Sequence, residues 1–228
     1  MDRQNLIIDA DDTLWENNIY FLKAFDDFVE FLDHSTLSPT EVRAVLDQIE
    51  DVNRRIHGYG SINFGRNLQE CYQRLCEREI RPADLETIMR LATRIMEQPV
   101  ELIEGVEETL DYLHSRHNLM LFTKGHPEEQ KLKIERSGIG KYFAYAAIVK
   151  EKDASTYRAL VRERALEPSI TWMIGNSPRS DINPALDAGL HAVFIPHRDT
   201  WVLEREALRR GPGKLVRLER FRDLQTIF

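Results

Sequence analysis

A short apolar run near the start of the chain leads directly into a cluster of carboxylates. Residues 6–8, Leu-Ile-Ile, are typical of a strand buried on both faces of a parallel sheet. Because side chains alternate along an extended chain, Asp9 and Asp11 are predicted to share one side. Such a pair favours reactive chemistry, with one aspartate as nucleophile beside Mg²⁺ and the other as acid and base. The plainer alternative is that Asp12 or Thr13 caps a helix.

A second apolar run, 119–122, ends in a hydroxyl residue, Thr123. The next three residues, Lys124, Gly125 and His126, precede a proline, at which a helix can begin. A hydroxyl and free backbone N–H groups at a helix start can bind phosphate. We therefore interpret Thr123, Lys124 and Gly125 as candidate substrate-binding residues, and His126 as a further candidate contact.

Two more polar groups follow predicted strands. Lys152 stands just before a predicted helix, with Lys150 as the alternative. The predicted strand 170–174 is followed by Gly-Asn, and Asp181 comes five residues after Asn176. In an open α/β sheet, ligands bind outside the carboxyl ends of the strands. These groups are therefore predicted to lie near Asp9 and Asp11.

The chain thus has four motifs: Asp-x-Asp-x-Thr at residues 9–13, the strand ending in Thr123, Lys152 before a helix, and the run from Gly175 to Asp181. They occur in the order found in the haloacid dehalogenase (HAD) superfamily, which the chain resembles over roughly residues 1–15 and 100–200. The resemblance implies that Asp9 attacks phosphorus and forms an aspartyl-phosphate. It implies that Asp11 serves as acid and base, and that Thr123 and Lys152 bind the phosphoryl oxygens.

The resemblance also implies a Mg²⁺ site formed by Asp9, Asp11, Asn176 and Asp181. The family usually has aspartate where this chain has Asn176. An amide oxygen can ligate Mg²⁺, but it removes one negative charge, which should weaken metal binding. Asp181 is then expected to be the direct anionic ligand.

The implied function is a Mg²⁺-dependent phosphatase acting on a small phosphorylated metabolite. A phosphotransferase such as a sugar-phosphate mutase is the alternative from another enzyme class. Metal-independent 2-haloacid dehalogenases lack the second aspartate of the first motif, so Asp11 argues against that activity. A non-catalytic sensor of phosphorylated ligands is motivated only by Asn176.

Helical periodicity fills the chain between the first two motifs. We predict an α/β, Rossmann-like parallel sheet with helices on both faces, formed by residues 1–15 and 100–228, and an all-helical cap domain at 16–99. Arg55 and Tyr59 lie in a glycine-containing segment of this cap, where they either contact the substrate or belong to a helix–helix turn. The cap helices are predicted at 19–32, 38–56, 64–76 and 82–96. The tail, 201–228, is predicted to form a helix rich in Arg and Glu followed by an edge strand at 215–218.

Composition agrees with a cytoplasmic enzyme. The 228-residue chain has a formal net charge of −7, which argues against nucleic acid as a partner, and no apolar run suggests a membrane partner. Cys71 and Cys76 are predicted to be buried free thiols. His114 and His117 are spaced as on a helix but have no further ligand beside them, so we interpret them as surface histidines. Nothing in the sequence favours a monomer over an oligomer.

Overall fold

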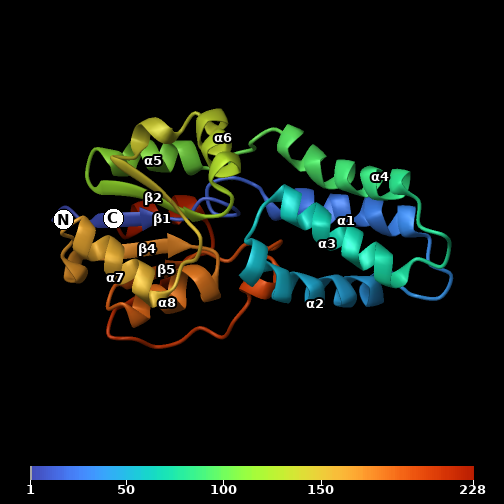
Figure 1. The fold of residues 1–228 in the computed structure, drawn as a ribbon. Helices are drawn as coiled ribbons and strands as arrows, with labels where there is room; N and C mark the ends of the chain where they lie inside the picture. Colours follow the sequence, from blue (N-terminus) through green and yellow to red (C-terminus); the bar gives the residue numbers. More distant parts are fainter. Residues whose placement is uncertain (1) are drawn as a thin grey trace. The chain divides into compact units, whose positions relative to one another are not determined.

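The computed structural model describes residues 2–228, which form two compact units (Figure 1). The first, here called the core unit, contains residues 2–18 and 100–228. The second, here called the helical unit, contains residues 19–99.

The core unit is built on a parallel sheet of six strands in the order β3-β2-β1-β4-β5-β6. Ile8 at the end of β1 pairs with Leu121 of β2 on one side and with Ile174 of β4 on the other, so the central strands end close together. This arrangement confirms the predicted parallel α/β sheet. The strands are β1 (Asn5–Ile8), β2 (Asn118–Lys124), β3 (Tyr145–Val149), β4 (Thr171–Gly175), β5 (His191–Phe194) and β6 (Leu215–Arg217).

Alternating side chains of β1 enter two different hydrophobic cores, which explains its continuous apolar sequence. Leu6 and Ile8 pack into a core that also contains Leu110 of helix α5. Ile7 points into the opposite core, where it joins Tyr157 of helix α7. Helices therefore cover both faces of the sheet (Figure 1). The core-unit helices are α5 (Val106–His114), α6 (Pro127–Ser137), α7 (Ala154–Glu163) and α8 (Asn183–Asp187), with a π-helical turn at Pro178–Ile182.

The predicted helix in the tail is wrong, whereas the predicted edge strand is present as β6. Between Trp201 and β6 the chain has only a 3-10 turn, Val202–Glu204. The buried Asn183 binds backbone groups in this part of the tail, donating to the carbonyl of Ala207 and accepting from the N–H of Arg209. The Asn183 side chain thus occupies two backbone groups that would pair with other backbone groups in a helix.

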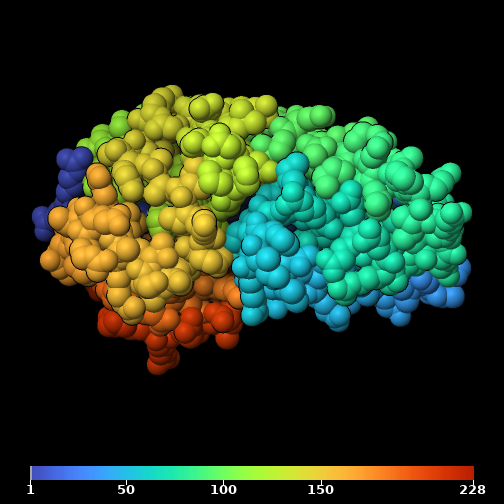
Figure 2. Space-filling view, viewed as in Figure 1, coloured from blue at the N-terminus to red at the C-terminus, as the bar shows by residue number. Residues whose placement is uncertain are grey.

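The helical unit contains α1 (Asn18–Leu32), α2 (Pro39–His57), α3 (Ser61–Leu75) and α4 (Pro82–Thr93), followed by a 3-10 turn, Arg94–Glu97. Helix α2 begins with a capping box, in which Ser38 and Glu41 each bind the backbone N–H of the other. Phe28, Leu46, Leu68 and Ile88 bring one residue from each helix into a single hydrophobic core. Figure 2 shows part of the outer surface of this unit, with the atoms of α3 and α4 in contact.

Both cysteines are free: Cys71 is buried in the helical unit and Cys76 is half-buried. The predicted free thiols are confirmed, whereas the predicted burial is confirmed for Cys71 alone. Burial raises the pKa of Cys71 to about 12. None of the described helices is long and apolar enough to cross a membrane.

His114 is exposed as predicted, but His117 is buried, so its interpretation as a surface histidine is wrong. The His117 ring packs edge-on against the Phe228 ring, with 5.6 Å between the ring centroids. Its Nδ1 accepts the N–H of Gln4, which requires that nitrogen to be unprotonated, and its Nε2 lies 3.3 Å from the backbone oxygen of Phe228. The ring thereby joins the starts of β1 and β2 to residue 228.

This environment predicts a pH-dependent stability. Burial lowers the pKa of His117 below its ordinary value of 6.5, so the unfolded chain takes up a proton at this residue before the folded chain does. Its contribution to stability is therefore complete above pH 6.5 and declines as the pH falls through and below that value. Urea unfolding midpoints at pH 7.5 and 5.5 should fall less between the two values in His117→Gln than in the wild type. An equal fall in both proteins would contradict the prediction.

Candidate active site

Four strands of the core unit deliver polar side chains to the carboxyl edge of the sheet. Asp9 follows β1, Thr123 lies near the end of β2, Lys152 follows β3 and Asn176 follows β4. All four are at least nine-tenths buried. The parallel register therefore brings together residues that lie far apart in the sequence.

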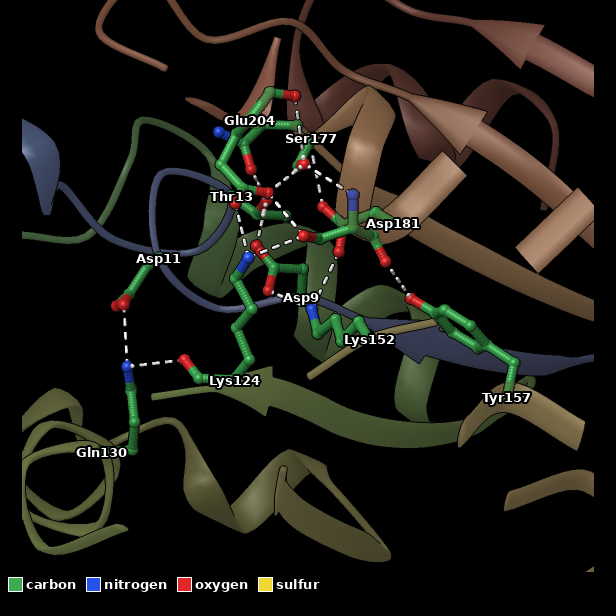
Figure 3. A network of polar contacts seen from close by, with 12 residues as sticks. Asp9, Asp11, Thr13, Lys124, Gln130, Lys152, Tyr157, Ser177, Asp181 and Glu204 are labelled. Carbon is green, nitrogen blue, oxygen red and sulfur yellow. Dashed lines mark hydrogen bonds and ion pairs between the residues drawn. The ribbon is translucent and has the colours of Figure 1, made fainter. Parts of the chain in front are cut away.

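Lys152 lies between two buried carboxylates. Its Nζ contacts Oδ1 of Asp9 and lies 2.8 Å from Oδ1 of Asp181 (Figure 3). Burial alone would lower the pKa of Lys152, but the charges of Asp181 and Asp9 outweigh burial and raise it. Lys150, the alternative lysine, is exposed. Two carboxylates thus share one cation.

Both oxygens of Asp181 already have partners. Oδ1 accepts from Lys152, and Oδ2 accepts the backbone N–H of Ser177 at 3.0 Å. Burial raises the pKa of Asp181, the negative charge of Asp9 adds to this effect, and Lys152 opposes it. With 1% of its surface exposed, Asp181 is placed to hold Lys152 and the loop after β4.

Asn176 is oriented by hydrogen bonds on both sides of its amide. Its Nδ2 donates to the Thr200 hydroxyl at 3.1 Å, and its Oδ1 accepts from the Thr13 hydroxyl at 3.3 Å. The same Thr13 hydroxyl lies 3.0 Å from Oδ2 of Asp9. The amide oxygen of Asn176 is therefore turned toward the Asp9 side, where an oxygen ligand for a cation would be needed.

Asp11 and Asp12 have different surroundings from Asp9. The carboxylate of Asp11 accepts from Trp15 Nε1 at 2.7 Å, from Gln130 Nε2 at 2.8 Å and from Lys133 Nζ at 2.6 Å, the last two belonging to α6. Figure 3 shows it directed toward Gln130 rather than toward Asp9.

Asp12 caps the start of α1. It has a positive φ of 58°, and its Oδ1 accepts the backbone N–H groups of Asn17 and Asn18. Burial raises the pKa of Asp12 to about 7, although these N–H groups oppose the rise. Helix capping, the plainer alternative, therefore applies to Asp12, and it leaves Asp9 and Asp11 available for the chemical interpretation.

A sequence model of the haloacid dehalogenase-like hydrolases matches residues 4–189, which include all the strand-end residues described above. The chain belongs to this hydrolase family. No curated protein matches it in sequence.

Solved structures share the HAD fold over almost the whole chain. A haloacid dehalogenase-like family hydrolase from Xanthomonas campestris is 28% identical with a TM-score of 0.82, covering 99% of this chain and 94% of its own. The Bacillus subtilis protein YfnB, described as a candidate HAD hydrolase and bound to magnesium, is 15% identical with a TM-score of 0.69, covering 100% and 99%. A 2-haloacid dehalogenase from Pseudomonas syringae is 17% identical with a TM-score of 0.63, covering 100% and 98%. HAD structures of this shape thus include both a magnesium-bound protein and a dehalogenase.

In this HAD hydrolase the charge of Lys124 is already compensated. Its Nζ pairs with the Glu204 carboxylate and lies 2.7 Å from the Ser180 hydroxyl. Gly125 follows with a φ of 152°, and the exposed His126 precedes α6 as its N-cap residue. The predicted substrate-binding run therefore does lie at the edge of the sheet, but Lys124 is not a free cation there.

Arg55 and Tyr59 belong to the helical unit, near the end of α2. Arg55 is exposed and pairs with Asp51 at 3.1 Å. Tyr59 is half-buried, and its carbonyl accepts from Asn63 at 3.2 Å. Their predicted contact with the substrate stays a prediction.

Several residues of the site were not identified from the sequence. Thr13 could have been, since it is the last residue of the first motif. The others carry no local signal, because their importance comes from groups more than twenty residues away. They are Gln130, Lys133, Thr200 and Glu204.

The close approach of Gly175 and Asp181 gives a stability prediction. A Cβ at position 175 would lie 2.3 Å from Oδ2 of Asp181, a distance that forces the buried carboxylate to move. Gly175→Ala should therefore lower the free energy of unfolding by about 1–3 kcal/mol, as overpacking commonly does. Gly140→Ala is the matched control, because its Cβ would meet only Ile134 at 3.6 Å. Equal urea midpoints for the two variants would refute the predicted clash.

Proposed function

We propose that this HAD hydrolase is a Mg²⁺-dependent phosphatase that cleaves a small phosphorylated metabolite through an aspartyl-phosphate. The observation that carries the proposal is a second carboxylate, Asp11, two residues after the Asp9 that contacts Lys152. An alkoxide leaving group needs a proton, whereas a halide does not. A second carboxyl group at this position of the sequence therefore favours phosphoester cleavage over carbon–halogen cleavage.

Asp9 is the proposed nucleophile. Its two oxygens are held by Lys152 and by the Thr13 hydroxyl, so the carboxylate has a fixed orientation. In the first step an oxygen of Asp9 bonds to phosphorus while the bond to the leaving oxygen breaks, and Asp11 gives that oxygen its proton. In the second step water attacks phosphorus, Asp11 takes a proton from the water, and the bond to Asp9 breaks to release phosphate.

Thr123 and Lys152 are proposed to bind the phosphoryl oxygens. Thr123 is almost fully buried at the end of β2, one strand away from Asp9. The charge of Lys152 also offsets the repulsion between an incoming phosphate and the carboxylates. This second task explains why a buried lysine is retained between two aspartates.

The groups around Asp9 fit a hard cation. The candidate ligand atoms are oxygens, from the Asp9 carboxylate and from the Asn176 amide, which Thr200 holds in place. Asp9 and Asp181 share a single cation, Lys152. Bound Mg²⁺ would neutralise charge shared by Asp9 and the phosphoryl group. We propose as its ligands the Asp9 carboxylate, the backbone carbonyl of Asp11, whose carboxylate is bound by α6, and the Asn176 amide oxygen. Asp181, whose oxygens have other partners, would act mainly through Lys152.

We propose that the helical unit is a cap that supplies specificity. Its exposed Arg55 and the nearby Tyr59 offer a cation and an aromatic ring at the end of α2, a combination suited to the leaving group of a small phosphorylated metabolite.

The proposal is tested by product release from a panel of phosphorylated metabolites and 2-haloacids, with Mg²⁺ and with excess EDTA. We expect phosphate release that requires Mg²⁺, and no halide release. Asp9→Asn should lower kcat at least about a thousandfold, because no nucleophile remains. Equal phosphate release by the wild type and Asp9→Asn would refute the proposal, and Mg²⁺-independent halide release would establish the dehalogenase instead. Phosphate transfer to a second hydroxyl with little release would establish a mutase.

Asp11→Asn separates acid–base catalysis from binding. Loss of a general acid typically costs about a hundredfold to ten-thousandfold in kcat. The loss should shrink for substrates with a good leaving group, such as 4-nitrophenyl phosphate, which needs little protonation. A uniform loss across substrates of different leaving-group pKa would contradict the role proposed for Asp11.

A further inference from the structure

The loop after β4, residues 176–183, is held by a distant part of the chain, residues 200–209. Thr200 accepts from Asn176, and the carbonyl of Leu203 accepts from Arg179 at 3.2 Å. Farther along, Asn183 is bound to the backbone groups of Ala207 and Arg209. The loop that carries Asn176 and Asp181 therefore has contacts with this segment along most of its length.

Glu204 makes the central contacts of this segment. Its Oε2 accepts from the Ser177 hydroxyl at 2.6 Å and also from the Ser180 hydroxyl, while its Oε1 pairs with Lys124 (Figure 3). Its exposed fraction is 8%. A charged side chain is rarely buried to this extent unless its partners compensate its charge. Here the partners are Lys124, at the end of β2, and Ser177 and Ser180, in the loop after β4.

Glu204 also balances the charge of the site. Burial alone would raise its pKa, but Lys124 and the two serines outweigh burial and lower it. Lys124 and Glu204 thus form a neutral pair beside the group of Asp9, Asp181 and Lys152. Without Glu204, Lys124 would lose the carboxylate with which it pairs, at the hydroxyl of Ser180 and next to Asp181.

We infer that Glu204 is a positioning residue, which fixes the loop 176–181 against β2 and neutralises Lys124, so that Asn176 is presented to a divalent cation and Asp181 to Lys152 in a fixed geometry. The effect on catalysis rests on the proposed function, but the effect on the loop does not. Glu204 acts through Ser177, Ser180 and Lys124, and it is not proposed to touch the substrate.

The test combines two measurements that need no substrate. Mg²⁺ binding by calorimetry should weaken about tenfold or more in Glu204→Gln, because the side chain keeps its size while Lys124 loses its counter-charge and repels the cation. Hydrogen exchange followed by mass spectrometry should quicken in peptides covering residues 176–183 and stay unchanged in those covering α5. Glu206→Gln is the matched control, since Glu206 lies in the same segment but is half exposed and contacts Asn183 instead.

Charge compensation and loop fixation are separated by a double variant. Glu204→Gln with Lys124→Met removes both members of the pair, and it should regain most of the Mg²⁺ affinity if compensation is the cause. Ser180→Ala removes the hydroxyl that donates to Glu204 and is a smaller change. It should quicken hydrogen exchange in the loop, and it can be measured even if Glu204→Gln does not fold.

The outcomes separate this inference from the proposed function. Unchanged Mg²⁺ affinity and unchanged loop exchange in Glu204→Gln would overturn the inference, as would equal effects in Glu206→Gln. Absence of Mg²⁺ binding by the wild type would instead remove the metal from the proposed function, and the exchange data would still decide whether Glu204 fixes the loop.

Discussion

The site depends on one buried cation shared by two buried carboxylates. Lys152 contacts Asp9 and Asp181 from a position with almost no solvent exposure, where unpaired charges would be very costly. Removing Lys152 would leave two buried carboxylates without a cation, and removing either aspartate would take away one of the two partners of Lys152. The three groups are therefore effectively a unit. Around it, Thr13 fixes the remaining oxygen of Asp9, and Ser177 fixes that of Asp181. In the proposed function, the presence of two carboxylates for one lysine is what would favour binding of Mg²⁺.

The three aspartates in residues 9–12 show how neighbouring carboxylates acquire different properties. Asp9 is paired with a buried lysine, Asp11 is bound by side chains of α6 and by Trp15, and Asp12 caps α1. Strand β1 ends at Ile8, and the positive φ of Asp12 turns the chain three residues after Asp9, so Asp9, Asp11 and Asp12 do not follow the alternation of an extended strand. Chemistry and helix capping are thus compatible within a single run.

The sequence predicted the sheet because each central strand carries a continuous apolar run, as burial on both faces demands. It also predicted which polar residues end those strands, since parallel strands bring their carboxyl ends to one edge. The roles of Lys133 and Glu204 could not be predicted in this way. Lys133 contacts Asp11, 122 residues earlier, and Glu204 contacts Ser177, 27 residues earlier, and nothing in the local sequence pattern marks either residue. The tail helix failed for a related reason: the Asn183 side chain takes up backbone groups that local propensity assigns to a helix.

The register of β1 has a consequence for how this site tolerates change. Ile8 is paired on both sides, with Leu121 and with Ile174, so β1 cannot slide without breaking two ladders at once. A slip of one residue would also exchange the two hydrophobic cores and would put Ala10 where Asp9 now meets Lys152. The register of β1 therefore sets the position of Asp9. An insertion or deletion between Asn5 and Asp9 would move Asp9 away from Lys152, although every polar residue of the site would still be present in the chain.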